Sequence, residues 1–162
     1  MSSFPWNHCP AWLEYAGASL ALFGDIVFAD ETATIADPHV TIGVVAGDGG
    51  AIIWPLLVGP NRAKEFLMTG DPLTGAQAER IGLVNHAVPA DELAARVDQM
   101  AQRLAHAPRL AIELTKRSVN IQVNNLVNNI LHASLALEGI TFRTEDHRDA
   151  VKAFLSRSKP SN

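Results

Sequence analysis

Residues 42–50 constrain the fold of this chain more than any other segment. Their sequence, IGVVAGDGG, holds four glycines in nine positions and leads into the apolar segment 51–58. A glycine-rich turn that opens a helix brings backbone N–H groups close to a neighbouring group, because glycine has no Cβ. Asp48 lies inside this turn. Two interpretations stay open: Asp48 is a helix N-cap, or the turn belongs to a functional site.

Composition and charge narrow the class of protein. The chain has 162 residues, of which 48% are hydrophobic and 19% charged, as expected for one globular domain with a real core. A formal net charge of −4 argues against nucleic acid as the main partner. No apolar run approaches the length of a membrane span, so we expect no membrane partner.

The N-terminal residues carry no recognisable secretory leader and no metal site. No basic stretch followed by an apolar one opens the chain. Its single cysteine, Cys9, cannot form an intrachain disulfide, which favours a reducing cytoplasm. His8 adjoins Cys9, but no second pair of metal ligands stands nearby, so we expect no bound metal. The expected localisation is cytoplasmic.

The sequence pattern changes character near residue 59. Residues 16–58 mix a short helix at 16–24 with short strands at 26–29 and 34–36. Residues 59–162 read almost entirely as helices, including a long one that begins near Pro108 and stops at Gly139. One side of this long helix is apolar over a width unusual for a solvent-facing helix. The residues of that side are Val119, Val123, Leu126, Val127, Ile130 and Leu131.

Six sequence blocks together resemble a known family. GASLALFGDI at 17–26, DPHV at 37–40 and IGVVAGDGG at 42–50 come first. PLLVG, LMTG and AERIGLVN continue the series to residue 85. In this order and spacing, the chain from about Ala16 onward resembles the C-terminal two-thirds of the crotonase (enoyl-CoA hydratase/isomerase) superfamily.

The resemblance implies an α/β fold. We expect a crotonase-like spiral core whose N-terminal half is missing, followed by a C-terminal helical oligomerisation module. The corresponding division is a segment 1–15 unlike the family, a partial core at 16–90 and a helical region at 91–162. The same resemblance implies assembly into a homotrimer or hexamer through the C-terminal helices.

The resemblance also implies a ligand and its contacts. The substrate would be an acyl-CoA thioester, with coenzyme A entering only as part of the substrate and no separate cofactor. Backbone N–H groups at Ala16 and Gly17 align with one half of the family's oxyanion hole. Arg157 and Lys159 align with basic residues that reach coenzyme A, although a solvated basic tail is the alternative interpretation.

Two substitutions depart from the family's hydratases. Ser19 and His39 stand where those enzymes carry glutamates, and the other oxyanion donor would precede residue 1. Adding water to a conjugated C=C bond needs a base and an acid, which paired glutamates supply. Asp48 and His39 are therefore the best catalytic candidates, with Asp48 as a proton-shuttling base and His39 as an acid or a water-orienting group. We expect their side chains to face the same cavity, at the N-terminal end of the helix opened by Gly49 and Gly50, and Asp48 to raise the pKa of His39.

Two functional classes follow from these observations. The first is an enzyme of acyl-CoA metabolism, such as fatty-acid metabolism, that acts on or binds an acyl-CoA thioester, with little hydratase activity. The alternative is a catalytically inactive, truncated crotonase fragment that serves as an oligomerising or binding module.

Overall fold

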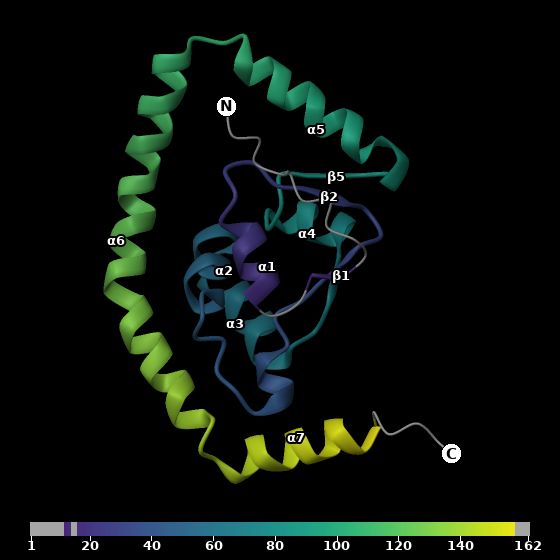
Figure 1. Cartoon of the computed structure of the whole chain (residues 1–162), viewed down its shortest axis with the longest axis vertical. Coiled ribbons are helices and arrows are strands. Elements are labelled where there is room, and N and C mark those ends of the chain that lie inside the picture. The colour runs from purple at the N-terminus through teal and green to yellow at the C-terminus, as the bar shows by residue number, and fades with distance from the viewer. Residues whose placement is uncertain (1–11, 14–15, 158–162) are drawn as a thin grey trace.

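The computed structural model describes residues 12–13 and 16–157 and has an α/β architecture of short strands and longer helices (Figure 1). The strands are β1 (Trp12–Leu13), β2 (Phe28–Asp30), β3 (Thr34–Ile35), β4 (Leu73–Thr74) and β5 (His86–Val88). The helices are α1 (Ala16–Leu22), a 3₁₀ turn η1 (His39–Ile42), α2 (Gly50–Val58), α3 (Pro60–Thr69), α4 (Gly75–Ile81), α5 (Ala90–Ala105), α6 (Arg109–Thr141) and α7 (Glu145–Arg157). Most of segment 1–15, and Lys159, lie outside the described residues.

The described strands form two small sheets. β3 pairs in parallel with β1 and antiparallel with β4, while β2 pairs in parallel with β5. Parallel strands need long crossover connections, and the chain from β2 to β5 supplies one that contains α2, α3 and α4. This crossover carries the glycine-rich turn and places it in the middle of the fold.

The hydrophobic core lies between these sheets and the helices of the crossover. Trp54 of α2 is fully buried, and its ring packs against Phe66 of α3 with centroids 5.8 Å apart. α2 carries apolar residues on most of its surface, as expected for a helix enclosed by other elements. The buried cluster comprises Leu22, Ala29, Ile35, Ile53, Trp54, Ala63, Leu73, Ala78, Leu83 and Val84.

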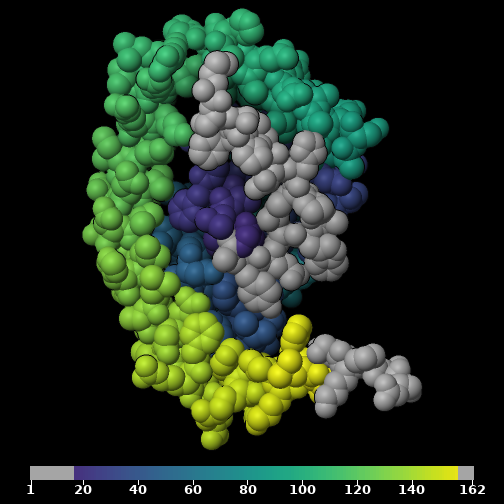
Figure 2. All heavy atoms as spheres, viewed as in Figure 1, coloured from purple at the N-terminus to yellow at the C-terminus, as the bar shows by residue number. Residues whose placement is uncertain are grey.

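The last helices form an outer frame around this core. Figure 1 shows α5, α6 and α7 bordering three sides of it, and Figure 2 shows α6 and α7 as a rim beside α1 and α2. The sequence predicts that the long helix stops at Gly139, which is wrong, because α6 continues to Thr141. Gly139 is exposed, and an added Cβ there would meet no atom within 4 Å, so nothing in the packing requires glycine to end the helix.

The apolar side of α6 is only partly covered. Val123, Leu126, Val127, Ile130 and Leu131 are half-buried, whereas Val119 is exposed. Other large apolar side chains of α6 are exposed as well, among them Leu110, Ile121, Leu137 and Ile140. None of the helices in the described part of the chain is long and apolar enough to cross a membrane.

The C-terminal end of α6 and the start of α7 hold the loop between η1 and α2. The Val45 backbone N–H donates to Oγ1 of Thr141 at 3.2 Å, and Nδ1 of His147 lies 2.7 Å from the carbonyl oxygen of Ile42. Gly47 touches α6 so closely that an added Cβ would lie 2.6 Å from the Ser134 carbonyl oxygen and 2.7 Å from Glu138. Glycine at position 47 is therefore what allows α6 to reach the loop.

We expect Gly47→Ala to lower the free energy of unfolding by about 1–3 kcal/mol, because the new methyl group must displace α6 from the loop. Gly139→Ala is the matched control. It adds a methyl group to an exposed position of the same helix and should raise stability by about 0.5–1 kcal/mol. Urea unfolding at equal protein concentrations measures both values. Equal effects of the two substitutions would contradict the close approach at Gly47.

Candidate functional site

A hydrogen-bonded aspartate and histidine form the centre of the candidate site. Nδ1 of His39 lies 2.5 Å from Oδ1 of Asp37, and both side chains are buried. Asp37 is the second residue after β3, and the intervening Pro38 precedes η1, in which His39 is the first residue. The local chain therefore holds the two side chains together without help from a distant segment.

Asp48 approaches the other ring nitrogen of the same histidine. Its Oδ2 lies 3.6 Å from Nε2 of His39, which makes an ion pair when the imidazole is protonated. The chain turns back after η1, where Gly43 adopts a left-handed conformation with a φ of 68° and the Val44 N–H donates to the His39 carbonyl at 3.0 Å. This reversal brings Asp48 to His39 from the beginning of α2.

The two carboxylates lie near the N-terminus of α2. Asp48 stands two residues before this helix, and Asp37 contacts Gly50, its first residue, at a position that a Cβ would fill. Negative charge is favoured at the N-terminus of a helix, where backbone N–H groups lack intrahelical partners. The glycine-rich turn therefore serves to admit carboxylates to the end of α2.

Glu138 is the fourth ionisable group of the cluster and comes from α6. It is 9% exposed, packs against Gly47, and interacts electrostatically with Asp48, His39 and Asp37. Three carboxylates thus surround one histidine. A cluster of this composition cannot carry all its charges cheaply in a buried place, so its protonation is shared among its members.

The pKa of His39 stands above its ordinary value of 6.5. Burial by itself lowers this pKa, but the hydrogen bond to Asp37 and the charges of Asp37, Asp48 and Glu138 outweigh burial. The sequence-based expectation that a nearby aspartate raises this pKa is confirmed in direction. The stronger aspartate is Asp37, however, and not Asp48.

The pKa of Glu138 also stands above its ordinary value of 4.5. Burial is the main cause, and the negative charge of Asp48 adds to it, while His39 acts in the opposite sense. Histidine and glutamate thus both retain a proton more strongly in this cluster than in water. The site holds candidate acids beside the carboxylate of Asp48, a pattern that suits proton transfer.

Among the residues that the structure describes, three buried oxygen atoms around the glycine-rich turn find no hydrogen-bond partner: Oγ of Ser19, Oδ2 of Asp37 and Oδ1 of Asp48. Ser19 is 2% exposed and lies in α1 against Gly49. Buried polar atoms without partners are uncommon, and they are most often met by a ligand or a water molecule. These oxygens therefore mark where the polar part of a substrate can be held.

The structure brings together some of the residues predicted from sequence and not others. Asp48 and His39 approach each other to 3.6 Å near the N-terminus of α2, and the cavity that the sequence predicts for them stays a prediction. Ala16 and Gly17 open α1, and nothing in the structure tests them as oxyanion donors. Arg157 is the last residue of α7, but its side chain, like all of Lys159, lies outside what the structure describes. Their role at coenzyme A stays a prediction.

Sequence reasoning missed Asp37 and Glu138 as members of the site. Asp37 was visible in the block 37–40, two residues before His39. Glu138 carries a weaker signal, because it is the only acidic residue between Glu113 and Glu145. Within the described ranges, no group of three or more histidine, cysteine, aspartate or glutamate side chains is arranged to hold a metal ion.

We expect the imidazole of His39 to titrate above pH 6.5, and Asp37→Asn to lower its midpoint, because the hydrogen bond and most of the stabilising charge are then lost. Histidine NMR signals followed against pH measure both midpoints. Asp71→Asn, at an exposed position of a loop, is the control and should leave the midpoint unchanged. If the titration midpoint of His39 were the same in Asp37→Asn as in the wild type, this would contradict the pairing of Asp37 with His39.

The same pairing has a consequence for stability. A histidine whose folded-state pKa exceeds its unfolded value binds its proton more tightly in the folded protein. Its contribution is therefore fully present below pH 6.5 and is lost as pH rises through the folded-state pKa. Urea unfolding should show this decline in the wild type and a smaller one in Asp37→Asn.

Comparison with known proteins places this geometry in a family. A sequence model described as enoyl-CoA hydratase/isomerase matches residues 14–162. Crotonyl-CoA hydratase of Syntrophomonas wolfei is 34% identical over 143 residues, which cover 88% of this chain and 55% of that protein. An enoyl-CoA hydratase/isomerase structure from Mycobacterium paratuberculosis superimposes with a TM-score of 0.81 and 37% identity, covering 88% of this chain and 57% of that one.

A third relative has a different activity. The structure of a β-diketone hydrolase from the cyanobacterium Anabaena, bound to (S)-3-oxocyclohexyl acetic acid, is 38% identical with a TM-score of 0.70, over 75% of this chain and 49% of that one. The chain thus spans about half the length of such relatives. The family match extends over nearly the whole sequence, and the fold agrees with it, so the chain belongs to the enoyl-CoA hydratase/isomerase family of the crotonase superfamily.

Proposed function

We propose that this chain binds an acyl-CoA thioester and moves a proton along its acyl chain, as an isomerase does. The observation that carries the proposal is the arrangement around His39, whose Nδ1 is held by Asp37 at 2.5 Å while its Nε2 faces Asp48 at 3.6 Å. Asp48 is the base and His39 the acid or orienting group. Family membership supports the thioester as the substrate class.

The reaction needs only one proton to leave and one to return. Asp48 takes a proton from carbon, and the electron pair of that C–H bond moves toward the thioester oxygen. Backbone N–H groups at Ala16 and Gly17 are proposed to stabilise that oxygen, as oxyanion donors do in acyl transfer. The proton then returns to a different carbon, so that a double bond shifts and nothing is added.

Hydration fits the same residues less well. It requires one group to activate water and another to protonate carbon, and Ser19 replaces one of the two glutamates that the resemblance implies for hydratases. A serine hydroxyl cannot take the place of a carboxyl group as a general acid or base near neutral pH. The buried Oγ of Ser19 is suited to hold a polar group, not to act as base.

Hydrolysis of a β-diketone is the second candidate. Its support is the 38% identity to the cyanobacterial hydrolase together with the Asp37–His39 pair, since a histidine that holds a proton strongly is also a good base when neutral. His39 would take a proton from water, the hydroxide would attack one carbonyl carbon, and the C–C bond to the central carbon would break. That carbon then takes up the proton, leaving a carboxylic acid and a ketone.

A catalytically inactive binding or oligomerising module is the remaining alternative. Its support is the large apolar surface that α6 exposes in the single chain. The same surface supports the proposal that this protein assembles as a trimer or hexamer, because contiguous exposed apolar residues mark contact surfaces.

The central test is exchange of substrate carbon-bound hydrogen with D₂O. We expect the chain to catalyse exchange or double-bond migration in a 3-enoyl-CoA, with crotonyl-CoA hydration near background. Asp48→Asn should slow exchange by about 100-fold or more, the usual contribution of a general base. Glu145→Asn, at an exposed position of α7, should leave the rate unchanged. Mass spectrometry of the acyl-CoA reads the exchange.

The outcomes separate the candidates. Loss of a cyclic β-diketone without exchange in the thioester would favour the hydrolase. Tight binding of acetoacetyl-CoA with neither reaction would favour the inactive module. A hydration rate near 10 per second, typical of a working enzyme, would overturn the isomerase proposal.

Assembly is tested separately from chemistry. We expect light scattering at micromolar concentration to give a mass well above the 17.4 kDa of one chain, because the apolar surface of α6 is otherwise left in water. Ile121→Glu, at a residue 61% exposed in the single chain, should lower the assembled mass. A monomeric mass with a cooperative melt would contradict assembly.

A further inference from the structure

We propose that Glu138 of α6 is a positioning residue of this site: packed against Gly47, it stands beside the turn that carries Asp48 and leaves Asp48 as the cluster's working base. The inference rests on the proposed function, and it concerns a residue that lies 90 positions after Asp48 in the sequence. Helix α6 thereby supplies a part of the site, and does not only cover the core.

The position of Glu138 is fixed by contacts on both sides of it. Its Cβ and one carboxylate oxygen would each lie 2.7 Å from a Cβ added to Gly47, the residue before Asp48. Three residues further along α6, Thr141 accepts a hydrogen bond from Val45 at 3.2 Å and donates one to the Glu138 carbonyl at 2.7 Å. The helix cannot withdraw Glu138 without releasing the loop that carries Asp48.

The charges of the four ionisable side chains show why the position of Glu138 matters. If all four groups were charged, Asp37, Asp48 and Glu138 would carry three negative charges against the single positive charge of His39. Asp37 is hydrogen-bonded to that histidine, and Asp48 lies partly open to solvent, whereas Glu138 is buried and forms no salt bridge with a cation of the described residues. Glu138 is therefore the carboxyl that is neutralised at least cost, by keeping its proton.

The number of protons held by Asp48 and Glu138 is then the same before and after one turnover. Before reaction, Asp48 and Glu138 together hold one proton, which is on Glu138. When Asp48 takes a proton from the substrate carbon, the pair holds two, and both carboxyls are neutral. Returning one proton to the next carbon restores the starting state. An ionised Glu138 would instead repel Asp48 and raise its affinity for a proton before the substrate arrives.

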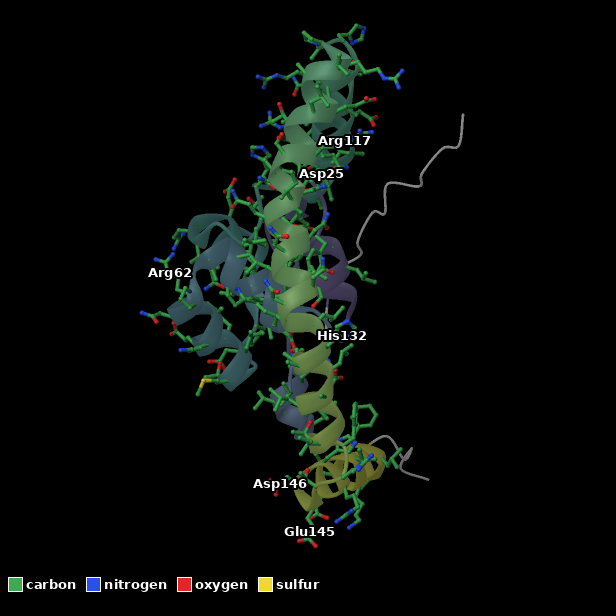
Figure 3. The ribbon with its side chains drawn as sticks, turned by 90° about the vertical axis from the view of Figure 1, so that its left-hand side faces the viewer. Asp25, Arg62, Arg117, His132, Glu145 and Asp146 are labelled. Carbon is green, nitrogen blue, oxygen red and sulfur yellow. The ribbon has the colours of Figure 1, made fainter. Side chains whose placement is uncertain are left out.

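Infrared spectroscopy of protein labelled with ¹³C-glutamate tests this without any substrate. In the wild type we expect a protonated-glutamate C=O band that persists well above pH 4.5, the ordinary value for glutamate. Glu138→Gln should abolish the persistent band, and Glu145→Gln, at an exposed glutamate near the start of α7 labelled in Figure 3, should leave it in place. Asp48→Asn should move the disappearance of the band to lower pH, because the neighbouring negative charge is gone.

Three results decide the inference. A band that survives Glu138→Gln, or a titration unmoved by Asp48→Asn, would overturn it. If Glu138→Gln fails to fold, the Asp48→Asn titration still decides, since Glu138 remains in place there. Substrate exchange that depends on Asp48 in a protein lacking the persistent band would reject the role of Glu138 and leave the proposed function standing. A persistent glutamate band in a protein that catalyses no substrate exchange would support the role of Glu138 and reject the proposed function.

Discussion

The contact of α6 with Gly47 is the constraint on which the rest of the site depends. A helix backbone and a loop meet there with no room for a Cβ. Because of that approach, hydrogen bonds from Thr141 and His147 can hold the loop, and a buried glutamate reaches Asp48. The frame helices and the core segment are thus parts of one structure, and the loop before α2 has its shape only while both are present.

The electrostatics of the cluster follow from this enclosure. Burial opposes charge on His39, yet the hydrogen bond to Asp37 and the charges of three neighbouring carboxylates raise its pKa above the ordinary value of 6.5. Burial equally opposes charge on Glu138, and there the neighbouring aspartates act in the same direction as burial. The ionised forms of histidine and glutamate have opposite charges, yet both pKa values are raised, so both groups retain a proton more strongly here than in water.

A separate question is what holds the outer helix α6 against the rest of the molecule. Figure 3 looks at this helix from outside and shows it running along the molecule, with Arg117 and His132 on it and Asp25 close by. Lys116 pairs with Asp25, which ties the N-terminal half of α6 to the segment after α1. Such an exposed pair contributes little to stability. The proposed assembly would bury apolar side chains of α6 against another chain and so hold this half of the helix more strongly.

Sequence by itself determined the α/β class and the family, because these depend on local periodicity, glycine placement and short motifs, but it did not assign the short strands β4 and β5 within the region read as helical. It also paired Asp48 with His39, since glycines let the ten residues from 39 to 48 fold back. It could not find Glu138 or the continuation of α6 past Gly139. Both features depend on which distant backbone packs against Gly47. Most positions of α6 are exposed or half-buried, and only the tertiary structure decides that Glu138 becomes buried beside three other ionisable groups.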